Sequence, residues 1–194
     1  YIEEKADNKE KIIYENIGND YPKGNPIVAL FDGMPMENHS LLSHRLIIDD
    51  PDEFANNYEV QYREHGTGMC SLIIHGDLNE NRSPISTPLY VRPIMKLKPW
   101  INNPIERVPD DCLLVDLIHR AVKRIFEGEN GVKPYESIKI INFSIGDSNL
   151  LFYHSISPLA RLLDWLSVKY NVLFIISSGN HIGKLELNNL YKDF

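Results

Sequence analysis

The stretch LVDLIHRAVKRIFEGENGVKPYESIKIINF, residues 114–143, decides the fold class of this chain. Its first half places apolar residues at the i, i+3, i+4, i+7, i+8 and i+11 positions of a helix, namely Leu114, Leu117, Ile118, Ala121, Val122 and Ile125. Gly128 follows near the predicted helix end, and residues 138–143 then form a short apolar run of the kind found in buried strands. A helix that leads directly into a buried strand predicts one half of a βαβ unit.

The same alternation continues on both sides of this stretch. Apolar residues at helical spacing between 159 and 166 predict a second amphipathic helix, with Ser157 as its N-cap and Pro158 at its first position. Apolar runs at residues 26–31, 88–95 and 172–177 predict further strands, and the uncharged stretch 65–76 predicts a buried helix. Strands that alternate with helices form a parallel sheet with helices on both faces, so the predicted fold class is α/β.

Composition narrows the function classes. The chain has 194 residues, 43% of them hydrophobic and 24% charged, which fits one globular domain. Its net charge of −7 argues against nucleic acid as a partner, because phosphate contacts need a basic face. No apolar run reaches the roughly 18 residues of a membrane span. The start of the chain is charged, without the apolar core of a signal peptide, and this predicts a cytoplasmic protein.

The predicted organisation has two parts. Residues 1–25 are expected to form an N-terminal arm or helix that ends in a turn, and residues 26–194 to form the main domain. Within it, residues 37–64 are a polar connection with a turn at 49–52, and residues 77–112 are a long segment whose role the residues do not reveal.

Polar residues stand where predicted elements end or begin. Asp32 follows the first strand, His65 begins the buried helix, Ser144 follows the strand at 138–143, and Asn180 follows the last strand. In parallel α/β sheets, functional groups gather at such strand ends. Taken singly, each also has an ordinary structural explanation, since Asp-Gly and Ser-Gly-Asn are common in turns and a histidine can cap a helix.

Taken together and in order, these segments resemble the subtilisin-like serine proteases. Members of that family have a strand that ends in Asp, then His-Gly-Thr at the head of a buried helix. An Asn-x-Ser-x-Gly strand edge follows, then a strand that ends in Ala-Gly-Asn, and last a Gly-Thr-Ser-x-Ala segment with the nucleophile. This sequence has FDGMP (31–35), HGTGMCSLI (65–73), INFSIG (141–146) and FIISSGN (174–180). The resemblance covers roughly residues 26–182.

The resemblance implies an incomplete subtilisin-like three-layer sandwich, a polypeptide substrate and no cofactor. It implies Asp32 as the triad carboxylate, His65 as the general base and Asn180 as the oxyanion donor. The substrate would lie against the strand edge and the pocket wall, formed by Ser144, Ile145, Gly146, Ser178 and Gly179. A serine hydroxyl needs an imidazole to take its proton, and a buried carboxylate keeps that imidazole in the right tautomer.

Three departures from the family pattern matter. In the helix at 65–76, Gly68, Met69 and Cys70 replace the commoner His-Val-Ala, but these residues are small or apolar and keep the packing. Gly33 stands where the family has Thr or Ser, and no Gly-Thr-Ser-x-Ala segment occurs, so the nucleophilic serine is absent from the chain. We therefore expect the 194 residues alone to be inactive. The chain is then either a fragment of a longer protease or an inactive peptide-binding module. A sheet cut after residues 172–177 would also favour self-association.

Other functions are disfavoured. A nucleotide-binding α/β domain would need G-x-G-x-x-G or G-x-x-x-x-G-K-[ST] after a strand, and neither occurs. No metal site is predicted, because the remaining histidines lack ligand spacing. We expect five of them at the surface or in loops: His39, His75, His119, His154 and His181.

Overall fold

The computed structural model describes residues 21–80, 82–100, 104–129, 131–145 and 156–177. Its strands are β1 Val28–Asp32, β2 Leu46–Ile48, β3 Leu89–Pro93, β4 Lys96–Lys98, β5 Ile105–Arg107, β6 Ile140–Phe143 and β7 Leu173–Ile176. Its helices are α2 Glu64–His75, α3 Leu114–Glu127 and α4 Pro158–Tyr170, with two short 3-10 helices, η1 Phe54–Asn57 and η2 Val60–Tyr62. Most of the predicted arm at residues 1–25 lies outside the described residues.

The main sheet is parallel. Its five strands lie in the order β2-β3-β1-β6-β7, so β1 is central. On β1, Leu30 is level with Val91 of β3 and with Asn142 of β6. Strands β4 and β5 pair with each other as a separate antiparallel hairpin. All carboxyl ends of the main sheet therefore point the same way, and Asp32 lies at that end of the central strand.

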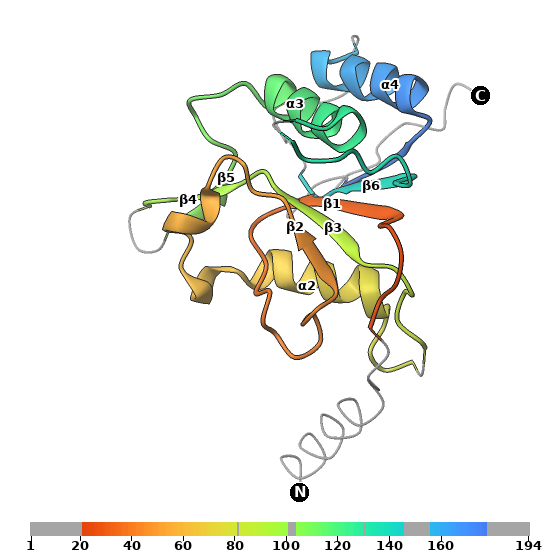
Figure 1. Ribbon diagram of the computed structural model, residues 1–194. Coiled ribbons are helices and arrows are strands. Elements are labelled where there is room, and N and C mark those ends of the chain that lie inside the picture. The colour runs from red at the N-terminus through yellow and green to blue at the C-terminus, as the bar shows by residue number, and fades with distance from the viewer. Residues whose placement is uncertain (1–20, 81, 101–103, 130, 146–155, 178–194) are drawn as a thin grey trace, which may run out of the picture.

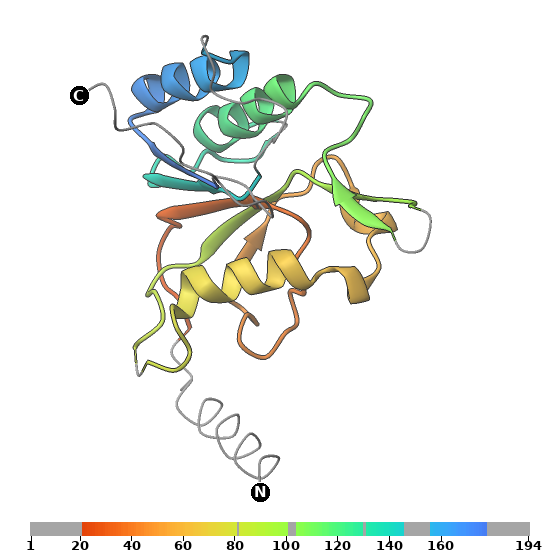
Figure 2. The ribbon, with the colours of Figure 1, turned by 180° about the vertical axis from the view of Figure 1, so that it is seen from behind.

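Helices cover both faces of this sheet. Helix α2 lies on one face, and α3 and α4 lie together on the other (Figures 1 and 2). The predicted fold class, an α/β protein with a parallel sheet between helical layers, is confirmed. None of the helices in the described part of the chain has the length and hydrophobicity that crossing a membrane requires.

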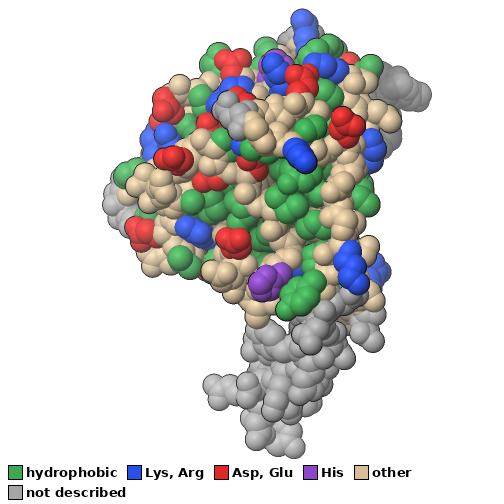
Figure 3. Space-filling view, in the orientation of Figure 1, with side chains coloured by type: hydrophobic (Ala, Val, Ile, Leu, Met, Phe, Trp, Pro, Cys, Tyr) green, Lys and Arg blue, Asp and Glu red, His purple; other side chains and the backbone are tan. Residues whose placement is uncertain are grey.

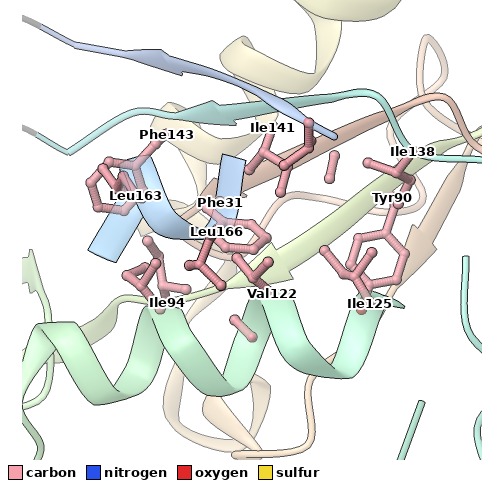
Figure 4. Packing of buried hydrophobic residues seen from close by; sticks show 14 of the residues in the cluster. Phe31, Tyr90, Ile94, Val122, Ile125, Ile138, Ile141, Phe143, Leu163 and Leu166 are labelled. Carbon is pink, nitrogen blue, oxygen red and sulfur yellow. The ribbon is translucent and has the colours of Figure 1, made fainter. Parts of the chain in front are cut away.

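The side chains of β1 alternate between two hydrophobic clusters. Ala29 and Phe31 point to the α3 and α4 side, where Val122, Ile125 and other buried residues meet them (Figure 4). Leu30 points to the α2 side, into a cluster with Leu42, Cys70, Ile74, Leu89 and Val91. Each fully buried aliphatic or aromatic side chain contributes about 1.5–3 kcal/mol to folding. The site-bearing strand is thus held from both faces.

The predicted helix ends are confirmed where the structure describes them. The Ser157 hydroxyl accepts a hydrogen bond from the Ala160 N–H at 3.1 Å, and Pro158 is the first residue of α4. Gly128 follows α3 with a φ of 71°, which ends the helix.

The structure also corrects several expectations. Three short strands were not predicted: β2 lies within residues 37–64, and β4 and β5 lie within residues 77–112. Each has only three residues, too few for a period of two to stand out. His75, expected at the surface or in a loop, is buried at the end of α2 and bonds the Leu41 carbonyl through Nε2 at 2.8 Å. Burial holds the pKa of this imidazole below its ordinary value.

Candidate active site

Asp32 is the last residue of the central strand and is completely buried. Its Oδ1 accepts a hydrogen bond from the backbone N–H of Gly33 at 2.6 Å. An isolated buried carboxylate is costly, so a charge at this position needs a partner. The chain supplies one from a helix on the α2 face of the sheet.

That partner is His65, in the first turn of α2. Its Nδ1 lies 2.7 Å from Asp32 Oδ1, although the two residues are 33 positions apart. An ionised carboxylate can only accept hydrogen bonds, so Nδ1 carries the proton and Nε2 is left to take one. The His65 side chain is 49% exposed whereas Asp32 is fully buried. The pair thus presents a reactive imidazole to solvent and keeps its carboxylate inside.

The pair changes the proton affinity of the imidazole. The hydrogen bond to Asp32 raises the pKa of His65 above its ordinary value, while burial of the ring opposes the shift. The negative charges of Asp32 and Glu106 add to the increase. A general base at this position is therefore stronger than a free histidine.

The two residues after His65 dock the helix onto the loop that follows β1. A Cβ on Gly66 would lie 2.6 Å from the Gly33 carbonyl oxygen and 3.2 Å from the Met34 carbonyl carbon. Only glycine permits this approach. The Thr67 hydroxyl accepts a hydrogen bond from the Met36 N–H at 2.9 Å and donates to the Arg63 carbonyl. In His-Gly-Thr, His65 thus pairs with Asp32, and Gly66 and Thr67 hold the helix against the loop after β1.

The end of β6 lies beside the end of β1. The Ser144 N–H donates to the Phe31 carbonyl at 3.3 Å, next to Asp32 in the chain. The Asn142 amide donates to the Ser144 hydroxyl at 2.7 Å. The structure therefore brings Ser144 and Ile145 to the same edge of the sheet as the Asp32–His65 pair. The predicted site residues Gly146, Ser178, Gly179 and Asn180 lie outside the described residues.

Two residues of this region were missed by the sequence analysis. Tyr58 is 2% exposed, and its hydroxyl donates a hydrogen bond to Glu106 of β5. Both side chains occupy the space directly over Gly33. Burial raises the pKa of each of them. The glycine in place of the expected Thr or Ser was the one sequence signal that something else fills this space.

A small pocket lies beside the site. It has a volume of about 330 Å³ and is lined by Met36, Glu37, Asn38, His39, Val60 and Arg63. Met36 is bonded to Thr67 of α2, so this pocket adjoins the helix end that carries His65. Within the described residues, no three His, Cys, Asp or Glu side chains are grouped as metal ligands.

The class of this protein follows from fold and site: a layered α/β protein with a carboxylate–imidazole pair at the carboxyl edge of its sheet. The fold resembles the solved structure of the prenylagaramide maturation protease PagA, with 20% sequence identity and a TM-score of 0.50. The match covers 88% of this chain and 50% of that chain, so this chain spans half the length of its structural neighbour. The fold is protease-like.

The family membership suggested by the four short motifs is wrong as stated. No family model matches the chain, and no curated protein matches it. The similarity to PagA is therefore one of fold, because 20% sequence identity is too low to show a shared family. The motifs are strand ends and one helix start, which any parallel sheet of this topology gathers at its carboxyl edge.

Proposed function

We propose that this chain is part of a peptide-bond hydrolase in which His65 is the general base and Asp32 orients it. The supporting observation is the 2.7 Å contact between Nδ1 and a fully buried carboxylate, with the rest of the imidazole half-exposed. This arrangement suits the activation of a hydroxyl nucleophile. The nucleophile comes from outside the described residues.

The proposed reaction uses the pair as a general base and its orienting carboxylate. His65 Nε2 takes the proton of a serine hydroxyl as its oxygen attacks the substrate carbonyl, and Asp32 stabilises the imidazolium. The same proton passes to the departing amine, and an acyl-enzyme forms. Water then attacks the acyl group as His65 takes its proton, and that proton passes to the serine oxygen as the ester bond breaks, which releases the acid and the free serine. We propose the Asn180 amide as donor to the oxyanion.

We further propose that the substrate lies extended along the end of β6. Residues at Ser144, Ile145 and Gly146 would pair with the peptide backbone, and Ser178 and Gly179 would border the pocket for one side chain. Ser144 and Ile145 already lie beside the end of β1, which supports this placement. A polypeptide is the partner that such an edge fits.

The proposal is tested with a fluorophosphonate probe and a fluorogenic peptide on the longest natural polypeptide that contains this chain. We expect one serine to be labelled, and His65→Ala to lower labelling and hydrolysis by about 10³-fold or more. His119→Ala is the matched control, because His119 contacts Trp165 on the opposite layer and should leave both unchanged. Labelling that survives His65→Ala would overturn the proposal.

The second candidate is a peptide-binding module that does not cleave. It would use the described strand end at Ser144 and Ile145 and needs no nucleophile. The same experiment separates the two, because a binding module would retain peptides without labelling or hydrolysis.

A further inference from the structure

The loop after β1 leaves a space that two side chains from distant segments fill. A Cβ on residue 33 would collide with Glu106 Oε1 and the Tyr58 hydroxyl, and would lie 3.2 Å from the Glu106 carboxyl carbon. Gly33 directly follows Asp32 and bonds its Oδ1. The β4–β5 hairpin, which lies at the carboxyl end of β3, thus places a second carboxylate against the backbone of the candidate site (Figure 1).

Tyr58 is held firmly enough to fix Glu106 in place. Its carbonyl accepts hydrogen bonds from Arg63 Nε at 2.9 Å and from Arg63 Nη2 at 2.7 Å. Its hydroxyl is bonded by the Met34 backbone and donates to Glu106. Met34 follows Gly33, and Arg63 directly precedes α2. Tyr58, which anchors Glu106, is therefore bonded to both segments that bring Asp32 and His65 together.

The cationic side chains of this region bind groups other than Glu106. On its own hairpin, Lys96 pairs with Asp111 at 3.3 Å, Lys98 pairs with Asp110, and the Arg107 guanidinium stacks on Trp100 at 5.5 Å. From the other elements, Arg63 is bonded to backbone carbonyls of Tyr58 and Ala55. Among the described residues, the ionisable groups that act on Glu106 are Tyr58, Asp32 and His65.

The influence between Glu106 and His65 is mutual. Burial and the charge of Asp32 raise the pKa of Glu106, while the hydrogen bond from Tyr58 and the charge of His65 oppose the rise. In turn, the charge of Glu106 contributes to the raised pKa of His65. Two carboxylates thus favour the imidazolium, one by a direct hydrogen bond and one through space.

We propose that Glu106 is a positioning residue of the Asp32–His65 pair: anchored by Tyr58 over Gly33, it places a second carboxylate against the backbone next to Asp32 and so favours the protonated imidazole. A role of Glu106 in catalysis rests on the proposed function, whereas its effect on the protonation of His65 can be measured in this chain alone. A role limited to packing the hairpin would need the shape of Glu106 and not its charge.

The test measures the protonation of His65 by NMR in the 194-residue chain, without any need for activity. Imidazole nitrogen resonances are followed against pH in the unmodified chain, in Glu106→Gln and in Asp32→Asn, and His65→Gln identifies the signal of His65. Glu106→Gln keeps the shape and can still accept from Tyr58. We expect a downward shift of the His65 midpoint in Glu106→Gln, because a charge that favours the imidazolium is removed.

The matched control is Glu59→Gln, which removes an exposed carboxylate next to Tyr58 in sequence, one that bonds Gln61 at 2.8 Å. It should shift the midpoint less than Glu106→Gln does. An unchanged midpoint in Glu106→Gln, with a lowered one in Asp32→Asn, would overturn the role of Glu106 and leave the proposed function intact. An unchanged midpoint in Asp32→Asn would instead contradict the pairing on which the proposed function stands.

Tyr58→Phe keeps the test decisive if Glu106→Gln does not fold, which circular dichroism would reveal. This variant leaves the charge of Glu106 but removes its anchor. We expect a smaller downward shift of the His65 midpoint, and no shift would overturn the proposal.

Discussion

Asp32 uses its two carboxylate oxygens unequally. Oδ1 accepts from the Gly33 N–H and from His65, whereas Oδ2 is buried and has no hydrogen-bond partner within the described residues. A buried charged oxygen without a partner costs free energy, and such costs concentrate at functional sites. Oδ1 is therefore the oxygen through which Asp32 stabilises a protonated His65.

This leads to a prediction for Asp32→Asn. A histidine whose pKa is raised on folding stabilises the native state fully below the unfolded pKa of about 6.5, and this stability is lost as pH rises through the folded pKa. We therefore expect Asp32→Asn to cost more stability at about pH 5.5 than at about pH 9. Urea unfolding at both pH values measures the difference.

The control for this prediction is the same substitution in a His65→Gln background, where the pH-dependent part of the difference should vanish. An equal cost at both pH values in the original background would show that Asp32 does not stabilise the imidazolium.

At the scale of the element, α2 combines two tasks in one helix. Its buried residues Cys70 and Ile74 pack under the sheet, while its first turn holds the site. The two glycines in the first half of α2, Gly66 and Gly68, have different surroundings. Gly66 lies against the backbone of Gly33 and Met34, whereas Gly68 has open space around it.

The two glycines therefore predict opposite outcomes. Gly66→Ala should destabilise the chain by about 1–3 kcal/mol, because the backbone that its Cβ would meet cannot move like a side chain. Gly68→Ala should be neutral or stabilising by up to about 1 kcal/mol, from helix propensity alone. Urea unfolding of both variants checks this, and equal effects would show that α2 does not dock as closely as described.

The turn after β2 joins distant segments of the chain through ion pairs. The turn expected at residues 49–52 carries Asp49, which binds Arg124 of α3 at 2.8 Å, and Asp52, which pairs with the buried Arg92 of β3. Arg92, near the carboxyl end of β3, is only 1% exposed. These ion pairs hold the connection after β2 against α3 and against β3, and removing Asp52 would leave the buried Arg92 without its carboxylate.

At the scale of the whole molecule, the β7 end of the sheet is less covered than the centre. Phe174 packs toward the α3 and α4 cluster, but Leu173 is 59% exposed and Ile175 is 49% exposed. Hydrophobic side chains also gather in the middle of the face shown in Figure 3. Exposed apolar surface at a sheet edge favours association with another chain.

We expect the 194-residue chain to self-associate as its concentration rises. Leu173→Thr with Ile175→Thr should weaken the association, because both remove apolar surface and keep strand propensity. Sedimentation velocity over a range of concentrations measures it. Val168→Thr is the control, since Val168 is 80% exposed on α4, away from the strand. A monodisperse monomer at all concentrations would contradict the expectation.

The sequence predicted the long elements of the fold better than the short ones. The local sequence pattern, that is apolar runs, helical spacing and capping residues, predicted the longer strands, the three described helices and the Ser157 cap, because these depend on residues close in the chain. It predicted Asp32 and His65 as site candidates, since each stands at the end or start of such an element. It missed the three-residue strands, whose pairing depends on partners far along the chain.

By itself the sequence determined the α/β class, the order of the main elements and the residue types available at the carboxyl edge. Only the tertiary structure decided that Asp32 and His65 touch across 33 positions, and that Tyr58 meets Glu106 across 48. The physical reason is one of range. Local periodicity selects helix or strand, whereas contacts between distant residues depend on how loops close and on how closely a glycine such as Gly66 lets two backbones approach.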